Sequence, residues 1–202
     1  MDSPAVPAYW NHNVHYDPVI LAAVPRPCAT ALDVGCADGR LTAALATRCG
    51  QVTGIDPDPG MITLARRRCH DAANVALIEN DFLAEPFGAK AFEFICANTA
   101  LHHMDFEAAL TRMRDLLRPG GRLAVVGLAR AGSPADLLPD VIAAPTNLLL
   151  RALHQEGSAG APVADPPMTW SQIRSTVRTI LPGATYRRRL LWRYTLTWRN
   201  PS

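Results

Sequence analysis

The sequence predicts an α/β fold organised around a mostly parallel, doubly wound sheet. Short apolar runs rich in Val, Ile and Leu alternate along the chain with segments of helical pattern, which is the arrangement of βαβ units. The runs lack polar alternation, as expected for parallel strands that are covered on both faces. Strands are therefore predicted at residues 31–35, 52–55, 75–78, 92–97 and 123–128.

Helices are predicted between these strands. Residues 40–49, 60–73 and 106–117 have helical patterns, and each ends at Gly, Asn or Pro-Gly. The Arg-Pro-Gly-Gly sequence at 118–121 is interpreted as the turn that stops the third helix and starts the next strand. A further helix at 16–24 is expected to lie over the sheet edge.

The rest of the chain interrupts this pattern and then resumes it. Residues 131–168 are rich in proline, and one or two short helices are expected there. A helix at 169–181 follows, with Thr or Ser as its cap and Gln172 near its third position. Two final strands are expected within 184–198, joined near 190–192.

Composition limits the classes of protein and partner. The chain has 202 residues, of which 49% are hydrophobic and 19% charged, as in a globular protein of one domain. Its net charge of +2 is too small to indicate a polyanion partner, so nucleic acid binding is not expected. The arginine clusters at 66–68 and 187–189 are interpreted as solvated basic faces.

Cysteine spacing and hydropathy indicate the compartment. The 5 cysteines are odd in number and form no C-x-x-C pair, so they indicate neither a disulfide framework nor a zinc site. The N-terminus lacks the basic and apolar regions of a signal peptide, and no apolar run is long enough to cross a membrane. We therefore expect a cytoplasmic protein with reduced thiols and no membrane partner.

The first chemical signal is the sequence at 32–40, Leu-Asp-Val-Gly-Cys-Ala-Asp-Gly-Arg. An apolar strand here runs into a turn with Gly35 and Gly39, and a helix follows. Such glycines adopt positive φ and let backbone N–H groups approach a ligand, while the helix directs its positive end at the turn. A glycine pair after a strand also fits a tight structural turn.

Acidic residues follow the next two strands. Asp56 ends the second strand, where its carboxylate would face the crevice of a doubly wound sheet and accept both hydroxyls of a ribose. The alternative role for Asp56 is a helix N-cap, which Asp58 could also supply. After the third strand, Glu-Asn-Asp-Phe at 79–82 offers an acceptor for an exocyclic amine beside an aromatic face.

In order and spacing, the segments LDVGCADG, GIDPDPGMI, ENDF, FICANTALHHM and LRPGGRLAVVG resemble the motifs of the class I S-adenosylmethionine-dependent methyltransferases. The resemblance covers residues 31–128, about half of the chain. It implies a Rossmann-like, seven-stranded sheet with a reversed last strand, which agrees with the two C-terminal strands. It also implies S-adenosyl-L-methionine as the cofactor and methyl transfer as the reaction.

The resemblance also implies which residues bind the cofactor. Asp33, Gly35 and Gly39 would hold the methionine end, and Asp56 the ribose. Asn98 would lie beside the methionine moiety and the transferred methyl. Pro57, Met61, Asp81 and Phe82 would hold the adenine. The full set implied to bind the cofactor is Asp33, Gly35, Cys36, Ala37, Gly39, Asp56, Pro57, Met61, Asp81, Phe82 and Asn98.

The glycine turn departs from the family pattern at one position. Many members have glycine where this chain has Ala37, but one methyl group is a small intrusion, and cofactor binding is expected to survive it. An NAD(P)-dependent oxidoreductase is a weaker alternative, because its G-x-G-x-x-G fingerprint does not match the spacing of Gly35 and Gly39 or the preceding Asp33.

Methyl transfer mainly requires alignment of a nucleophile with an electrophilic methyl and exclusion of water. A general base helps if the acceptor is a hydroxyl or a protonated amine. His102 and His103 follow the fourth strand, where an acceptor would sit, and are the candidate catalytic residues. The alternative is that this pair only caps or packs the strand-to-helix junction.

Two further segments are candidates for contact with the acceptor. The N-terminal segment is dense in aromatic and imidazole side chains and predicts a lid over cofactor and acceptor, or else an arm packed on the sheet edge. The apolar stretch at 135–153 fits the wall of an acceptor pocket, a dimer contact or plain core. The candidate substrate-binding residues are Tyr9, Trp10, His12, His15 and Tyr16.

The sequence therefore predicts one methyltransferase domain with an N-terminal arm or lid (1–30), a cofactor-binding core (31–130), a cap-like insert (131–168) and a C-terminal helix with two strands (169–202). We expect methylation of a small, apolar organic molecule at O, N or C, by a monomer or homodimer without a metal. The Pro-Pro-aromatic sequence of the branch that methylates nucleic acids and proteins does not follow Asn98. The alternative is a non-catalytic regulatory or scaffold protein that binds the same cofactor.

Overall fold

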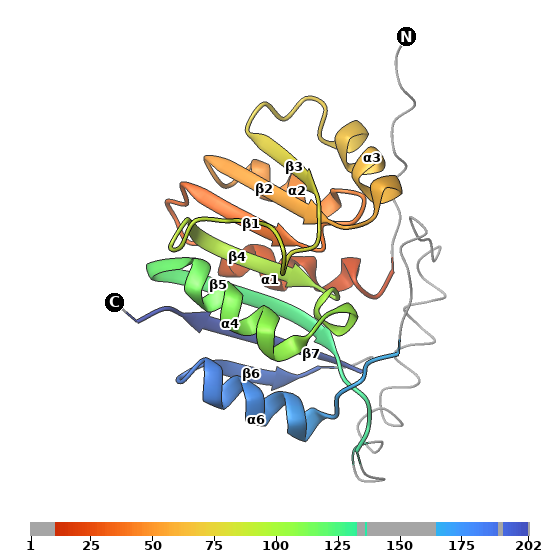
Figure 1. The fold of residues 1–202 in the computed structure, drawn as a ribbon, viewed down its shortest axis with the longest axis vertical. Coiled ribbons are helices and arrows are strands. Elements are labelled where there is room, and N and C mark those ends of the chain that lie inside the picture. The colour runs from red at the N-terminus through yellow and green to blue at the C-terminus, as the bar shows by residue number, and fades with distance from the viewer. Residues whose placement is uncertain (1–10, 133–135, 137–164, 190–191, 202) are drawn as a thin grey trace.

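The structure, a computed structural model, describes residues 11–132, 136, 165–189 and 192–201. The described chain forms a seven-stranded sheet with helices packed on both faces (Figure 1). The strands are β1 (Thr30–Val34), β2 (Gln51–Asp56), β3 (Val75–Glu79), β4 (Phe92–Asn98), β5 (Leu117–Leu128), β6 (Thr185–Arg188) and β7 (Arg193–Arg199).

The strand order is β3-β2-β1-β4-β5-β7-β6. Strands β1 to β5 pair in parallel, and β7 runs antiparallel to both β5 and β6. This confirms the predicted doubly wound sheet with a reversed last strand. The order reverses between β1 and β4, and ligands of open α/β sheets bind outside the carboxyl ends of the strands at such a point.

Helices cover both faces of the sheet. In Figure 1, α1 and α2 lie behind the sheet and α4 and α6 lie in front of it, while α3 packs against β2 and β3. The elements are α1 (Asp17–Ala23), α2 (Arg40–Ala46), α3 (Pro59–Arg68), α4 (Phe106–Leu116), α6 (Trp170–Ile180) and the short 3₁₀ helices η1 (Val14–Tyr16) and η2 (Leu101–His103).

Two apolar clusters hold these layers together. Behind the sheet, Ile20 of α1 and Leu45 of α2 pack with Phe94 of β4. In front, Leu110 of α4 and Val177 of α6 belong to a larger cluster that includes the inward side chains of β4, β5 and β7. Because the central strands are buried from both sides, their sequences read as continuous apolar runs.

The helix caps agree with the sequence patterns. Thr169 caps α6, and it forms the predicted capping box with Gln172: the Gln172 N–H donates to Thr169 Oγ1, and the Thr169 N–H donates to Gln172 Oε1 at 2.9 Å. Asp105 caps α4 through the Ala108 N–H at 2.8 Å. Such caps satisfy backbone donors that have no partner inside the helix.

The structure differs from the prediction at several element ends. The Arg-Pro-Gly-Gly sequence lies inside β5 as an irregularity, because Leu117 already pairs with Phe92 before Arg122 pairs with Phe94. Helix α2 ends at Ala46, three residues early, and Asn74 Nδ2 donates to the carbonyl oxygens of Ala46 and Cys49 at 3.0 Å each. A distant side chain thus satisfies the carbonyls at this helix end.

Some predictions fall outside the described residues. The short helices expected within 131–168 and the strand join near 190–192 belong mostly to parts of the chain that the structure does not describe. Across residues 11–132, 136, 165–189 and 192–201, no helix has the length and apolar character that crossing a membrane requires.

Candidate active site

A cavity of about 620 Å³ lies at the carboxyl ends of the parallel strands, on both sides of the point where the strand order reverses. This volume is typical of small-molecule sites. The predicted cofactor residues converge there, with the exception of Gly39, whose neighbours Asp38 and Arg40 line the cavity instead. The predicted residues that line it are Asp33, Gly35, Cys36, Ala37, Asp56, Pro57, Met61, Asp81, Phe82 and Asn98.

The turn between β1 and α2 requires its glycines for conformation and packing. Gly35 and Gly39 have φ values of 70° and 76°, in the left-handed region. A Cβ on Gly35 would lie 2.3 Å from the Ala100 Cβ, and one on Gly39 would lie 2.8 Å from the Ala65 Cβ. Ala37 adopts φ 46°, so the residue that departs from the family glycine accepts a conformation that costs about 1–2 kcal/mol.

Asp56 holds this turn in place. Its Oδ2 accepts a hydrogen bond from the Ala37 N–H at 2.9 Å, and its Oδ1 accepts one from the Asp58 N–H at 3.0 Å. Asp58 itself caps α3 through the Gly60 and Met61 N–H groups, so the capping role belongs to Asp58. Each oxygen of Asp56 keeps acceptor capacity toward the cavity.

The cavity wall near β3 combines aromatic and apolar surface with an acid. The Phe82 side chain is buried, and the Arg112 guanidinium lies 5.5 Å from its ring centroid. Arg112 also donates to the carbonyl oxygen of Glu85, so it holds the loop that carries Phe82 against α4. The Asp81 Oδ1 accepts from the Leu83 N–H at 2.8 Å, which orients its carboxylate in the same loop.

Asp33 is the buried acid of the site. Thr42 Oγ1 donates to its Oδ2 at 2.7 Å, and the Cys96 thiol lies 3.6 Å from its Oδ1. Burial raises the pKa of Asp33 to about 6, although the bonds from Thr42 and Cys96 oppose this rise. A cation that approached Asp33 would favour its charged form.

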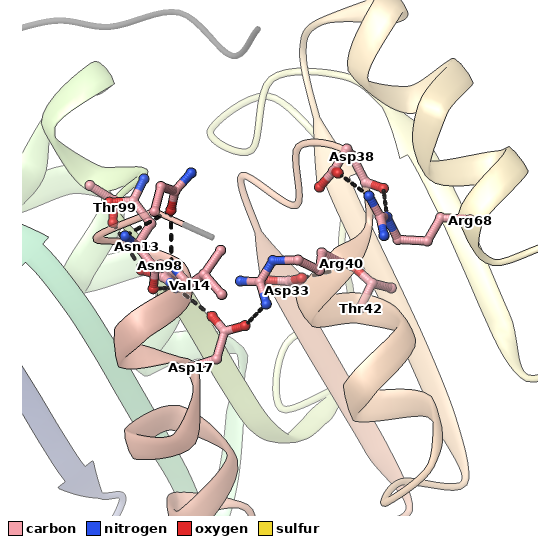
Figure 2. A network of polar contacts seen from close by, with 11 residues as sticks. Asn13, Val14, Asp17, Asp33, Asp38, Arg40, Thr42, Arg68, Asn98 and Thr99 are labelled. Carbon is pink, nitrogen blue, oxygen red and sulfur yellow. Dashed lines mark hydrogen bonds and ion pairs between the residues drawn. The ribbon is translucent and has the colours of Figure 1, made fainter. Parts of the chain in front are cut away.

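A polar network joins the N-terminal segment to the end of β4 (Figure 2). Asn98 Nδ2 donates to the Asn13 carbonyl oxygen at 3.0 Å and to Asp17 Oδ1 at 2.7 Å. The other carboxylate oxygen of Asp17 pairs with Arg40, the first residue of α2. Both amide hydrogens of Asn98 are therefore used inside the protein, and Asn98 presents acceptor capacity to the cavity.

Thr99 fixes the orientation of this amide. Its Oγ1 donates to Asn98 Oδ1 at 2.8 Å, and its N–H donates to the Val126 carbonyl oxygen at 2.7 Å. Thr99 has φ 60°, which is rare for a β-branched residue. Strained backbone of this kind concentrates at functional sites, where surrounding contacts hold it.

The predicted histidine pair lies at the cavity. His102 and His103 both line it, with their ring centroids 4.0 Å apart. The His102 Nδ1 is buried and has no hydrogen-bond partner in the described part of the chain. Burial, together with the nearby charges of His103 and Arg193, lowers the pKa of His102 to about 4, so this ring is neutral at neutral pH.

The structure separates the candidate substrate-binding residues. His12 lines the cavity. Tyr16 is buried in the cluster behind the sheet, and exposed His15 packs edge-on against it, with ring centroids 5.0 Å apart; neither is among the described residues that line the cavity. Tyr16 and α1 therefore pack on a face of the sheet, against β4 and β5, and not on the sheet edge as the sequence predicted. Tyr9 and Trp10 lie outside the described residues.

Sequence reasoning missed Arg193. This residue begins β7, is buried, and lines the cavity. Its Nη2 donates to Asn13 Oδ1, and burial lowers its pKa to about 10, which leaves the guanidinium charged at neutral pH. The sequence places Arg193 in a predicted strand of alternating pattern, but no local signal identifies the face or the partner of its side chain.

The lining fits S-adenosylmethionine in its chemistry. An anchored carboxylate at the end of β2 suits a ribose diol, buried apolar side chains suit an adenine ring, and the buried acid Asp33 suits a cationic methionine end. In the described part of the chain, no three His, Cys, Asp or Glu side chains lie together as metal ligands would.

Comparisons with known proteins agree with this geometry. A family model described as "Methyltransferase domain" matches residues 31–121. The chain is 36% identical over 205 residues, and over 100% of both chains, to uncharacterized methyltransferases of Mycobacterium bovis and Mycobacterium tuberculosis. It is 34% identical over 151 residues to a trans-aconitate 2-methyltransferase of Methylobacterium radiotolerans, covering 73% of this chain and 52% of that one.

Solved structures share the fold. The N-methyltransferase NodS of Bradyrhizobium japonicum, in complex with S-adenosyl-L-homocysteine, matches with a TM-score of 0.64 at 19% identity, over 95% of this chain and 89% of that one. The YcgJ protein of Bacillus subtilis matches with a TM-score of 0.63, over 86% and 69%. The cavity, the motifs and the full-length relatives lead to one assignment. The chain belongs to the class I methyltransferases, and its cofactor is S-adenosylmethionine.

Proposed function

We propose that the chain transfers the methyl group of S-adenosylmethionine to a small organic acceptor that binds between Asn98 and His102. The observation that carries this proposal is one cavity whose lining includes both the predicted cofactor residues and the histidine pair. The names of several relatives refer to small acceptors, among them trans-aconitate and 2-phytyl-1,4-naphtoquinone. These acceptors differ in chemistry, so they support the size of the acceptor rather than the methylated atom.

Each lining residue is assigned to one part of the cofactor. Asp56 would accept the ribose hydroxyls, Phe82 and Met61 would contact the adenine, and Asp33 would stabilise the ammonium of the methionine end. The bound cofactor supplies an electrophilic methyl group. The protein contributes orientation: Asn98, whose amide is fixed by Thr99 and Asp17, positions the cofactor end nearest the acceptor.

His102 has the properties of a positioning group more than of a strong base. Because the pKa of His102 is lowered to about 4, the neutral ring accepts hydrogen bonds throughout the physiological range, yet it is a weak base. We propose that the neutral His102 ring, which lines the cavity, contacts the acceptor and orients it.

We also propose that the segment before α1 covers the site. Asn11, His12, Asn13 and Val14 line the cavity, and the Asn13 backbone is bound to Asn98. Residues from this segment would exclude water from the reacting atoms. Deletion of residues 1–16 is expected to lower turnover strongly, and unchanged turnover in the deletion variant would contradict this role.

Calorimetric titration tests the proposed cofactor site. Wild type is expected to bind S-adenosylmethionine with micromolar affinity and not to bind NADH. Asp56→Ala removes the ribose acceptor and the bond that holds Ala37, so affinity should fall by at least about tenfold. The matched variant Asp58→Ala removes the α3 cap and is expected to lower stability by about 1 kcal/mol with a smaller effect on affinity. If folded wild type does not bind S-adenosylmethionine, the proposal is contradicted.

A further inference from the structure

Charge is unevenly distributed along the cavity. The part formed by the ends of β1, β2 and β3 is lined by carboxylates, including Asp33, Asp56 and Asp81, and by Arg40, whose charge is paired with Asp17. The part toward β5 and β7 is lined by Arg193 and by imidazoles, and no described carboxylate lines that part. The first part matches a cofactor that has hydroxyl and cationic groups. The second part presents the positive charge of Arg193 to the molecule that binds there.

Arg193 belongs to the acceptor part of the cavity by its place in the sheet. It pairs with Leu128 at the carboxyl end of β5, and β7 lies three strands from β1. At roughly 4.8 Å per strand, this corresponds to about 14 Å between the two backbones. The guanidinium contacts the Asn13 side chain, and the Asn13 backbone contacts Asn98, so Arg193 lies on the side of Asn98 away from Asp56.

The chemistry of this side chain indicates its ligand. A guanidinium has a planar set of donors that matches the oxygens of an oxyanion. The hydrogen bond from Arg193 Nη2 to Asn13 Oδ1 holds the guanidinium in position. The neighbouring ring of His102 is neutral at neutral pH, because burial lowers its pKa. A carboxylate matches the single charge of Arg193 better than a phosphate, which carries about −1.5 to −2.

We propose that the acceptor is a small organic acid whose carboxylate binds the Arg193 guanidinium, with the methylated atom directed toward Asn98. This inference rests on the proposed methyl transfer and adds a substrate class to it. Apolar lining from Leu128, Met104 and Val14 gives the carbon skeleton of such an acid a matching surface. The acceptor predicted from the sequence as apolar is thereby assigned an anionic group.

Matched acid and amide probes test the inference on wild type. Protein saturated with S-adenosylhomocysteine is titrated by calorimetry with benzoate, benzamide and phenyl phosphate at pH 7.5 and low ionic strength. Benzoate can form a charge-assisted hydrogen bond with Arg193, whereas benzamide is neutral. We therefore expect benzoate to bind about 10-fold or more tightly than benzamide. Equal binding of acid and amide, or a preference for phenyl phosphate over benzoate, would overturn the proposal.

Three variants locate the effect. Arg193→Gln is expected to abolish the preference for benzoate over benzamide and to change the affinity for S-adenosylhomocysteine less than about threefold. Arg193→Lys keeps the charge and should retain part of the preference. Arg189→Gln, which removes a hydrogen bond to Thr195 away from the cavity lining, should retain all of it.

The outcomes separate this inference from the proposed function. If Arg193→Gln keeps the benzoate preference, or if it loses cofactor affinity instead, Arg193 does not hold the acceptor and the inference is wrong while methyl transfer stands. If folded wild type fails to bind S-adenosylhomocysteine, the proposed function fails and the inference fails with it. Because the wild-type preference is measured first, a misfolded variant cannot conceal a negative result.

Discussion

Asp33 shows how one buried acid links stability to function. Its pKa is raised from 3.8 to about 6, chiefly by burial. The folded state therefore retains a proton that the unfolded state loses, and the stability from this group is present below about pH 4 and lost as pH rises through 6. Above pH 6 the buried charge costs about 2–3 kcal/mol, since each tenfold change in proton affinity corresponds to about 1.4 kcal/mol. A bound ammonium would offset this cost.

Asp33→Asn tests this account. The neutral amide keeps an acceptor for Thr42 and removes the charge, so the variant without cofactor should be more stable than wild type at pH 8, by about 2 kcal/mol. The same variant should bind S-adenosylmethionine at least about tenfold more weakly. Urea unfolding at pH 4 and pH 8, together with titration of the cofactor, measures both effects. Equal stability of variant and wild type at both pH values would contradict the assigned cost.

His102 has the opposite dependence on pH. Its pKa is lowered from 6.5 to about 4, so the stability that it contributes is present above pH 6.5 and lost as pH falls through 4. His102→Leu should therefore lose less stability than wild type between pH 7 and pH 4. The measurement is the difference in urea midpoint between variant and wild type at several pH values. A difference that stays constant with pH would mean that the ring does not titrate as its burial implies.

Prediction from sequence reached some residues of the site and missed others. Asp33, Asp56 and Asn98 follow strands in motifs, and parallel strands bring their carboxyl ends to one edge, so convergence of these residues followed from order alone. The partnership of Asn13 with Arg193 joins residues 180 positions apart, and no local pattern specifies it. Contacts of this kind depend on the register of β7, which only the folded sheet defines.

At the scale of elements, the β5–β7 pair provides a test of packing. Gly127 lies directly opposite Tyr194 in this pair, and a Cβ on Gly127 would lie 2.2 Å from the Tyr194 Oη. The Tyr194 ring is buried and stacks on Tyr186, with centroids 5.3 Å apart. Glycine at this position therefore makes room for an aromatic ring from the neighbouring strand.

Gly127→Ala should lower the free energy of unfolding by about 1–3 kcal/mol or more, because the methyl group overlaps a ring that cannot move freely. Gly88→Ala is the matched control: a Cβ at Gly88 would meet nothing within 4 Å, and little change is expected. Urea midpoints of the two variants and wild type provide the comparison. Similar midpoints for all three would show that Tyr194 shifts without cost.

The elements themselves were largely predictable, and their ends less so. Apolar runs located the first five strands, and the Thr169–Gln172 pair located the start of α6. The sequence at 118–121 has the residues of a turn, yet the chain keeps pairing with β4 on both sides of it. Turn residues specify local conformation, whereas the neighbouring strand decides whether pairing continues.

At the scale of the whole molecule, polar contacts connect the segment at 11–17 to the turn between β1 and α2. Asp17 at the start of α1 contacts Asn98 at the end of β4 and Arg40 at the start of α2 (Figure 2). Burial raises the pKa of Asp17, and the pairing with Arg40 opposes this rise. A ligand that orders the turn before Arg40 should therefore also order the segment before α1, since both are held by one carboxylate.

Amide hydrogen exchange measures this coupling. S-adenosylhomocysteine should slow exchange at 33–40, where the cofactor is expected to bind, and also at 11–17, which reaches that turn through Asp17 and Arg40. Asp17→Ala should retain the first protection and lose most of the second, because the link is removed while the turn remains. Arg48→Ala is the control. Arg48 donates a hydrogen bond to the carbonyl oxygen of Leu21 at 2.8 Å, and Leu21 lies on α1, as Asp17 does, but away from the cavity lining. If Asp17→Ala keeps full protection at 11–17, the cofactor orders this segment by direct contact and the network does not transmit its binding.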